Sequence, residues 1–175
     1  MANREALRDL QARLANRLQA AKSEALSVSS WLAVEAGAKS YLLPLGHSGE
    51  IFPWGAVQPV PYTQKWFLGV ANLRGGLSGV VDLAVLLGDS PVRTEQKLAE
   101  ASLLALNTAL EVNVALLVDR LAGLRGVDAF VSSEPPAPDA PSFFGSVYLD
   151  ASGARWQELN LQLLAQHPTF LSISA

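Results

Sequence analysis

The chain has 175 residues, of which 50% are hydrophobic and only 17% are charged, whereas about a quarter of the residues in an average soluble domain are charged. The net charge of −3 gives no general attraction to nucleic acid or to an anionic membrane, and the absence of cysteine excludes disulfides, thiolate metal sites and thiol catalysis. The apolar share instead indicates a large core or a surface that binds other proteins.

The N-terminal segment predicts an amphipathic helix over residues 3–22. Leucines recur there at three- and four-residue spacing, opposite a face that carries four arginines and a lysine. The segment has no apolar leader, so a secretory signal is not predicted. The helix could pack on its own domain, or it could dock on a partner or a second copy; binding to a membrane surface is disfavoured because aromatic anchors are missing. We expect a helix within residues 1–26 and one domain over residues 27–175.

Short apolar runs separated by Gly and Pro follow, and such runs predict β-strands. Residues 31–35 and 40–45 form two predicted strands joined by a tight turn at 36–39, and residues 50–52 follow a second turn. Three prolines make residues 53–63 an irregular loop.

The longest apolar stretch runs from Trp66 to Gly88, yet it contains Arg74, Asp82 and five glycines. A bilayer span would not tolerate that content cheaply, so we expect a cytoplasmic protein without direct membrane insertion. Within the stretch, residues 77–83 predict a strand, after which Asp82 caps one helical turn that Gly88 ends.

Residues 89–100 are predicted to be polar and solvated. Strands are predicted at 102–106 and 112–118 around a reversal at Asn107, and the valines favour them over one helix across 100–118. The remaining predicted elements are an extended segment at 121–131 with candidate bulges at Gly123 and Gly126, a proline-rich loop at 132–142, a hairpin of 144–149 with 155–159, and a helix from Leu159 to Gln166 that Pro168 stops.

These elements predict a mainly β architecture, a small barrel or sandwich with a helix at each end. The chain lacks alternating strands and helices, so a doubly wound sheet is not expected. His47 and His167 have no carboxylate cluster near them in sequence and do not predict a metal site. A hydrolase that uses His47 is a remote alternative, because a nucleophile needs both a base and an orienting acid. We expect no enzyme activity and no cofactor.

Arg74 is the residue that points most clearly to a function. A charge in apolar surroundings needs a partner, and the guanidinium suits bidentate pairing with a carboxylate. Glu50 and Asp82 are the candidate partners. The pair could fix two loops inside the protein, or it could orient Arg74 at the rim of an interface, and the two roles are compatible. Asp82 fits a structural role as an N-cap, and Asp119 fits a position at the end of a strand.

Four short motifs in a fixed order resemble the CheW-like domain over roughly residues 30–165. They are Glu50-Ile51, Gly69 followed by Asn72-Leu73-Arg74-Gly75, Val80-Val81-Asp82-Leu83, and Leu117-Val118-Asp119. In that family the Gly is followed by a short helical turn. Members also usually carry Arg or Lys soon after Val-Asp-Leu, whereas Ala84-Val85 follows here. The N-terminal helix and the segment from Asn160 to Ile173 resemble the PilI-type branch, the adaptors of twitching motility driven by type IV pili.

The resemblance implies two packed five-stranded SH3-like barrels and a non-catalytic adaptor in a chemosensory array. The implied partners are the regulatory domain of a CheA-type histidine kinase and the cytoplasmic tip of a chemoreceptor. Glu50 and Arg74 would then be paired charges beside the receptor site, supported by Ile51, Leu73 and Val81. The structural positions of the motifs would be Gly69, Asn72, Gly75, Asp82 and Asp119. The alternative from another class is a stand-alone β-barrel module that binds a small molecule or a peptide.

Overall fold

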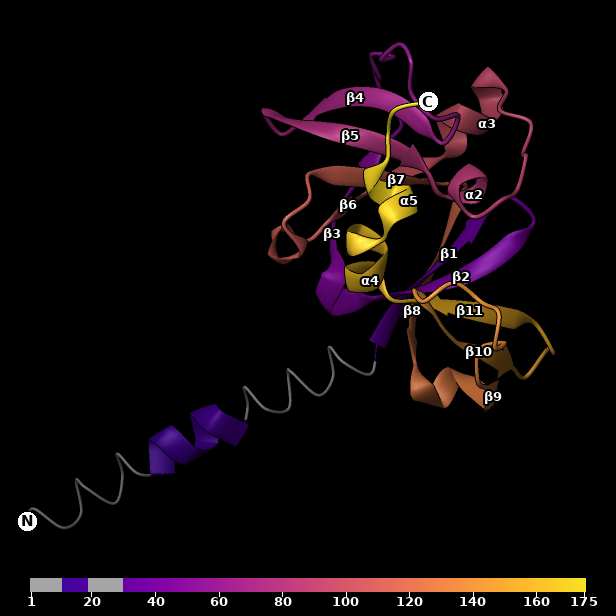
Figure 1. The fold of residues 1–175 in the computed structure, drawn as a ribbon. Coiled ribbons are helices and arrows are strands. Elements are labelled where there is room, and N and C mark those ends of the chain that lie inside the picture. Colours follow the sequence, from indigo (N-terminus) through magenta and orange to yellow (C-terminus); the bar gives the residue numbers. More distant parts are fainter. Residues whose placement is uncertain (1–10, 19–29) are drawn as a thin grey trace, which may run out of the picture.

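The computed structural model describes residues 11–18 and 30–175. Residues 11–18 are helical with exposed side chains, including those of Leu14 and Leu18. In Figure 1 this short helix lies apart from the domain. The helix predicted over 3–22 is therefore confirmed at residues 11–18, and its other residues lie outside the described ones. The division into residues 1–26 and 27–175 stays a prediction.

Residues 30–175 form eleven strands with short helices between them. The strands are β1 (Ser30–Ala36), β2 (Lys39–Pro44), β3 (Ser48–Pro53), β4 (Phe67–Leu73), β5 (Gly76–Asp82), β6 (Ser102–Leu106), β7 (Val114–Val118), β8 (Arg120–Gly126), β9 (Phe130–Glu134), β10 (Phe144–Asp150) and β11 (Arg155–Leu159). The α-helices are α2 (Leu83–Leu86), α3 (Glu95–Glu100), α4 (Leu161–Gln166) and α5 (Pro168–Leu171), and the 3-10 turns are η1 (Leu45–His47), η2 (Thr108–Leu110) and η3 (Val127–Ala129).

The strands form two sheets that the chain visits in turn. The six-stranded sheet has the order β8-β1-β2-β11-β10-β9, and the five-stranded sheet has the order β3-β6-β7-β5-β4. The first sheet therefore combines both ends of the domain, while the second is built from its middle. Helices α4 and α5, yellow in Figure 1, return toward the five-stranded sheet, where the ring of Phe170 stacks on Trp66 at 6.3 Å.

The prediction of a mainly β, CheW-like architecture is confirmed, with one difference in strand number. One sheet has six strands, because η3 turns the chain after β8 and returns it as β9 against β10. Among the described residues no ladder closes either sheet into a complete barrel. A single bridge does cross the seam of the five-stranded sheet, where Gln58 and Val70 exchange backbone hydrogen bonds of 2.8 and 2.9 Å.

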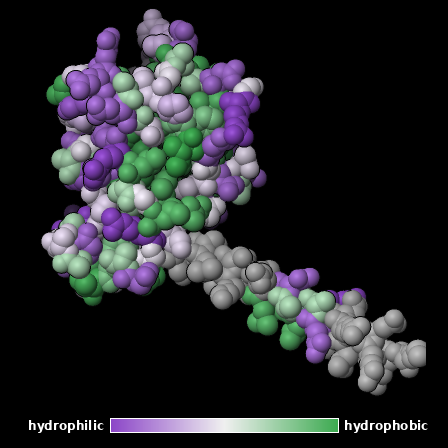
Figure 2. Space-filling view, turned by 180° about the vertical axis from the view of Figure 1, so that it is seen from behind, coloured by the Kyte–Doolittle hydropathy of each residue, from purple (hydrophilic) through white to green (hydrophobic). Residues whose placement is uncertain are grey.

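Buried apolar side chains occupy three regions: the interior of each sheet and the space between the sheets. Other apolar residues lie at the surface, and Figure 2 shows them gathered on one face of the domain. Leu103 and Leu117 fill the five-stranded interior, whereas their neighbours Leu104 and Leu116 lie between the sheets. The six-stranded interior contains Trp31, Ala33, Leu42 and Trp156. Central strands are thus buried on both faces, which explains why their sequences are continuous apolar runs rather than alternating ones. Each fully buried Leu or Val side chain in these regions contributes about 1.5–3 kcal/mol through burial.

Most predicted strands are confirmed within a few residues. These are the strands predicted at 31–35, 40–45, 50–52, 77–83, 102–106, 112–118, 144–149 and 155–159. The tight turn at 36–39 contains Gly37 with φ +63°, and Gly88 ends α2 with φ +90°. Gly123 lies at a bulge, as predicted, because the pairing of β1 with β8 shifts register beside it. Gly126 is not a bulge; it pairs in register with Ser30 and caps η3.

Other features were not predicted or are corrected. None of residues 89–100 is buried, in agreement with a polar, solvated segment, but the segment also contains the unpredicted helix α3. Thr94 caps α3 by accepting a hydrogen bond from Lys97 N at 3.2 Å. The short helical turn that the resemblance implied after Gly69 is absent; Gly69 lies within β4, a strand that the apolar run hid. Pro168 occupies the first turn of α5 rather than only ending a helix, since its fixed φ suits that position. No helix in the described parts of the chain has the length and apolarity needed to cross a membrane.

Candidate protein-binding site

The predicted pair of Glu50 and Arg74 spans the seam of the five-stranded sheet. Glu50 lies on β3, one edge strand, and Arg74 follows β4, the other edge strand. Arg74 Nη2 lies 2.6 Å from Glu50 Oε1, with the two side chains 75% and 42% exposed. Glu50 is therefore the partner of Arg74. An ion pair this exposed contributes only about 0–1 kcal/mol to stability.

The turn that carries Arg74 is unfavourable for an arginine. Leu73 pairs with Gly76, which leaves Arg74 and Gly75 as a two-residue hairpin turn with φ of +50° and +79°. Positive φ at both positions is typical of a type I′ turn, where Asn-Gly is preferred. Asn72 supports the turn by accepting a hydrogen bond from Gly75 N at 2.8 Å. A left-handed conformation costs a non-glycine residue about 1–2 kcal/mol, so the needs of the turn do not explain an arginine here.

Gly69 allows the two edges of the five-stranded sheet to approach each other near this ion pair. Its φ is +137°, and a Cβ at this position would lie 2.1 Å from the carbonyl oxygen of Gln58. Gln58 is the residue whose backbone bridges to Val70. Only glycine fits this approach without displacing the bridge. The structural role predicted for Gly69 is thus explained by the contact between β4 and the segment after β3.

A groove of about 350 Å³ runs beside the ion pair. Glu50, Leu73 and Arg74 line one part of it, and Asn107 and Asn113 line another. The groove thus combines a charged pair with apolar and amide side chains, as protein interfaces do at the border of core and rim. Ile51 on β3 is also exposed, but it does not line this groove.

Val81 does not belong to this surface. It is 1% exposed and packs in the core between the two sheets. Its inclusion among the binding residues is therefore corrected: it supports β5 from inside the core, and a partner cannot touch it. Alternation along β5 explains this, because Val80 faces the sheet interior and Val81 faces the opposite sheet.

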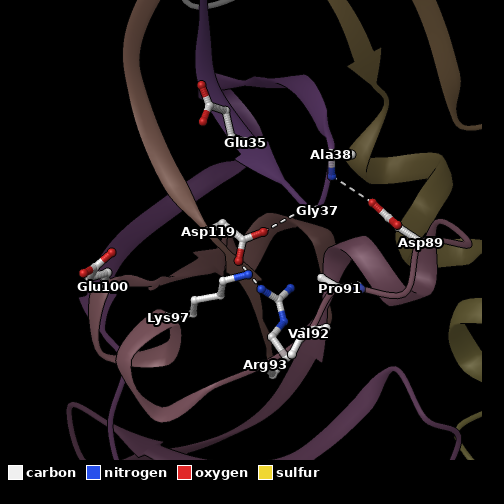
Figure 3. Close-up of a pocket in the computed structure, with 10 residues that line it drawn as sticks. All are labelled: Glu35, Gly37, Ala38, Asp89, Pro91, Val92, Arg93, Lys97, Glu100 and Asp119. Carbon is white, nitrogen blue, oxygen red and sulfur yellow. Dashed lines mark hydrogen bonds and ion pairs between the residues drawn. The ribbon is translucent and has the colours of Figure 1, made fainter.

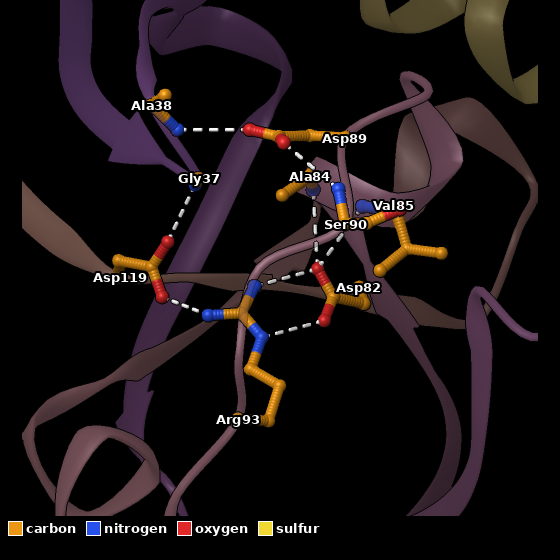
Figure 4. A network of polar contacts seen from close by, with 9 residues as sticks. All are labelled: Gly37, Ala38, Asp82, Ala84, Val85, Asp89, Ser90, Arg93 and Asp119. Carbon is orange, nitrogen blue, oxygen red and sulfur yellow. Dashed lines mark hydrogen bonds and ion pairs between the residues drawn. The ribbon is translucent and has the colours of Figure 1, made fainter.

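Asp82 belongs to a second charged cluster. It caps α2, as predicted, by accepting hydrogen bonds from Ala84 N at 3.1 Å and Val85 N at 3.3 Å. Its cationic partner is Arg93, whose Nε and Nη2 donate to the two carboxylate oxygens at 2.8 and 2.7 Å. Figure 4 shows this forked contact. Asp82 is therefore not a partner of Arg74.

Asp119 lies on the other side of the same guanidinium. It follows β7, as predicted, and accepts hydrogen bonds from Arg93 Nη1 and from Gly37 N, the latter at 2.6 Å. Asp89 accepts from Ala38 N at 2.8 Å, and backbone hydrogen bonds from Ala38 and Ser90 lower the pKa of Asp89. These groups border a groove of about 400 Å³, seen in Figure 3.

Arg93 is the important residue that sequence reasoning missed. It falls in the segment interpreted as polar and solvated, where nothing local marks it as buried. A signal existed: Ala84-Val85 stands where members of the resembled family usually have a cation, and once Glu50 is taken as the partner of Arg74, neither Asp82 nor Asp119 has a predicted cationic partner. Arg93 supplies that cation from eleven residues beyond Asp82.

The two histidines lie in different elements. His47 ends η1, and its Nδ1 is buried without a hydrogen-bond partner in the described structure. His167 accepts a hydrogen bond from Thr169 N at 3.3 Å and contacts the ring of Phe143 edge-on. Within residues 11–18 and 30–175 no group of His, Cys, Asp and Glu has the arrangement that would hold a metal ion.

Comparison with known proteins agrees with this architecture. A relative named Protein PilI, from Pseudomonas aeruginosa, is 29% identical over 160 residues, which cover 88% of this chain and 85% of that protein. The crystal structure of the scaffolding protein TtCheW from Thermoanaerobacter tengcongensis superposes with a TM-score of 0.66 at 16% identity, covering 83% of this chain and 97% of that one. The sequence model of the CheW-like domain matches residues 30–169, which include all eleven strands and both charged clusters. The chain belongs to the CheW-like domain family.

Proposed function

We propose that this protein is a non-catalytic chemosensory adaptor that couples the cytoplasmic tip of a chemoreceptor to the regulatory domain of a CheA-type histidine kinase. Membership of the CheW-like family supports this proposal, as does the fold shared with a protein described as a scaffold. The interiors of both sheets are filled by side chains such as Trp31, Trp156 and Leu117. This filling disfavours the alternative of a β-barrel module that binds a small molecule inside a sheet.

The observation that carries the proposal is the display of Arg74. Its side chain is 75% exposed, it adopts φ +50°, and Glu50 orients it through a 2.6 Å contact. A surface pair offers too little stability to offset the strain of a left-handed arginine. Strain that is retained without a structural reason is typical of functional positions. Arg74 and Glu50, with Ile51 and Leu73 beside them, are therefore proposed to contact a partner.

The signalling pathway of this protein is proposed from its similarity to PilI. PilI of Pseudomonas aeruginosa matches most of both chains, and its branch was also indicated by the N-terminal helix and the C-terminal segment of this sequence. We place this protein in a chemosensory system of type IV pili that controls twitching motility, at receptor arrays in the cytoplasm. Deletion of its gene should abolish twitching while leaving pilin production intact.

A pull-down tests the proposed site. Receptor tips and the kinase regulatory domain from the same genome are immobilised separately, and binding of the wild type is compared with Arg74→Glu. The control is Arg155→Glu, which reverses an arginine of similar exposure in another ion pair, 3.0 Å from Glu134 on the six-stranded sheet. We expect Arg74→Glu to lose binding to at least one partner by about tenfold or more, and Arg155→Glu to bind as the wild type does. Wild-type binding by both variants would contradict the proposed site.

A further inference from the structure

Asp82, Arg93 and Asp119 form a chain of contacts that joins the two sheets, here called the clamp. Asp82 ends β5 in the five-stranded sheet, and Arg93 lies in the connection between α2 and α3. Asp119 lies where the chain crosses from β7 to β8, between the sheets. The amide of Gly37, which donates the last hydrogen bond of the clamp to Asp119, belongs to the β1–β2 turn of the six-stranded sheet. The path therefore starts in one sheet and ends in the other (Figure 4).

The clamp is shielded from water along most of its length. The side chains of Asp82, Arg93 and Asp119 are 1%, 15% and 27% exposed. Burial alone would lower the pKa of Arg93, but the hydrogen bonds and charges of Asp82 and Asp119 raise it, so the guanidinium stays charged. Buried charges interact more strongly than exposed ones, because little water screens them.

The clamp supplies directional contacts that the apolar core between the sheets does not. The free energy of apolar packing depends on the area removed from water and only weakly on the relative orientation of the groups. The planar guanidinium of an arginine, in contrast, donates to both oxygens of a carboxylate in few orientations. The backbone of Asp119 is fixed on β1 by a hydrogen bond of 2.8 Å from its N to Glu35 O. With its backbone fixed, the Asp119 side chain can hold Arg93 and Gly37 in one relative position.

We propose that the clamp sets the orientation of the two sheets relative to each other, with Asp119 joining Arg93 to the β1–β2 turn of the six-stranded sheet. Asp89 assists by holding Ala38, the neighbour of Gly37 in the same turn. The proposal goes beyond the adaptor function and does not depend on the identity of any partner, because its consequence is a geometry within the chain.

The distance between the sheets can be measured by pulsed electron paramagnetic resonance. The chain has no cysteine, so two introduced cysteines would be the only labelled thiols. Leu77→Cys on β5 and Ser133→Cys on β9 place one spin label on each sheet at exposed positions. The test variant is Asp119→Ala, which removes the contacts to Arg93 and Gly37 but keeps the buried pair of Arg93 with Asp82.

The matched control is Asp150→Ala. Asp150 also accepts hydrogen bonds from backbone amides, those of Ser152 and Ala154, and from an NH donor, Trp156 Nε1, but all of them lie within the six-stranded sheet or its turns. We expect Asp119→Ala to widen the distance distribution by about twofold or to shift it. Asp150→Ala should lower thermal stability and leave the distribution as it is in the wild type.

A second variant tests whether Asp89 can hold the β1–β2 turn when Asp119 is absent. Asp119→Ala combined with Asp89→Ala removes both carboxylates that hold the β1–β2 turn, and we expect a still broader distribution. If both variants fold and retain the wild-type distance distribution, the proposal is overturned. That result would leave the adaptor function unaffected, just as a failed pull-down would leave the clamp unaffected.

Discussion

The two charged clusters of this protein use the same chemistry in opposite surroundings. Arg74 and Glu50 are 75% and 42% exposed and meet at 2.6 Å on the seam of one sheet. Arg93 and Asp82 are 15% and 1% exposed and meet at 2.7 Å between elements of the core. Burial, not the presence of an ion pair, decides which arginine serves the fold and which remains available to a partner.

The largest expected effect lies in the buried cluster. Arg93→Met keeps much of the side-chain volume but leaves Asp82 buried without its cation, so we expect a loss of about 3–5 kcal/mol in the free energy of unfolding. Denaturant unfolding measures it. Arg120→Met is the control, because Arg120 pairs with Glu35 at the surface at 2.6 Å and should cost less than about 1 kcal/mol. Equal losses in the two variants would show that the buried ion pair stabilises the fold no more than an exposed one.

The next effect concerns the seam that carries Arg74. Gly69→Ala places a Cβ 2.1 Å from Gln58 O at φ +137°, so we expect a loss of about 2–3 kcal/mol from strain and the displaced bridge. Gly153 also has positive φ, +82°, but a Cβ there would meet nothing within 4 Å. Gly153→Ala should therefore cost only about 1–2 kcal/mol. A smaller loss for Gly69→Ala than for Gly153→Ala would refute the role given to the seam.

A pH dependence of stability is expected at Asp150, a carboxylate outside both charged clusters, and it is the weakest of these effects. Hydrogen bonds from the side chains of Ser152 and Trp156 lower the pKa of Asp150 to about 2. Because the folded-state pKa lies below the ordinary value, Asp150 stabilises the fold above about pH 4, and this contribution is lost as the pH falls toward 2. Asp150→Asn should show a shallower loss of stability over that range in acid unfolding. An unchanged acid profile would show that the turn does not depend on the charge.

Local patterns were enough to predict several parts of this structure. The strands on either side of Gly37 followed from apolar runs around a turn, and the cap at Asp82 followed from its position between a strand and a helical turn. Glu50 was named as a candidate partner of Arg74 because a charge in an apolar stretch needs a carboxylate. The structure shows, however, that Arg74 is exposed rather than enclosed, because it lies in the two-residue turn between β4 and β5.

The features that the sequence did not predict depend largely on contacts between residues far apart in the chain. Arg93 meets Asp119 across 26 positions, and Asp119 meets Gly37 across 82; no periodicity in the sequence encodes such pairings. Strand β4 was hidden because it continues into β5 through a two-residue turn whose first residue is an arginine instead of the usual Asn or Gly. Val81 was included with the binding residues because it belongs to one of the motifs that carry the family resemblance. Its side chain lies in the core, because side chains alternate between the two faces of β5.

The most direct test of the central claim replaces Arg74 by the residue that its turn prefers. Arg74→Asn gives the Asn-Gly pair favoured in type I′ turns, so unfolding free energy should stay equal or rise by up to about 1 kcal/mol. Calorimetric titration of the same variant with the receptor tip and with the kinase regulatory domain should show at least one affinity reduced by about tenfold. Loss of stability with both affinities unchanged would mean that Arg74 serves the fold, and the distinction between the two clusters would fail.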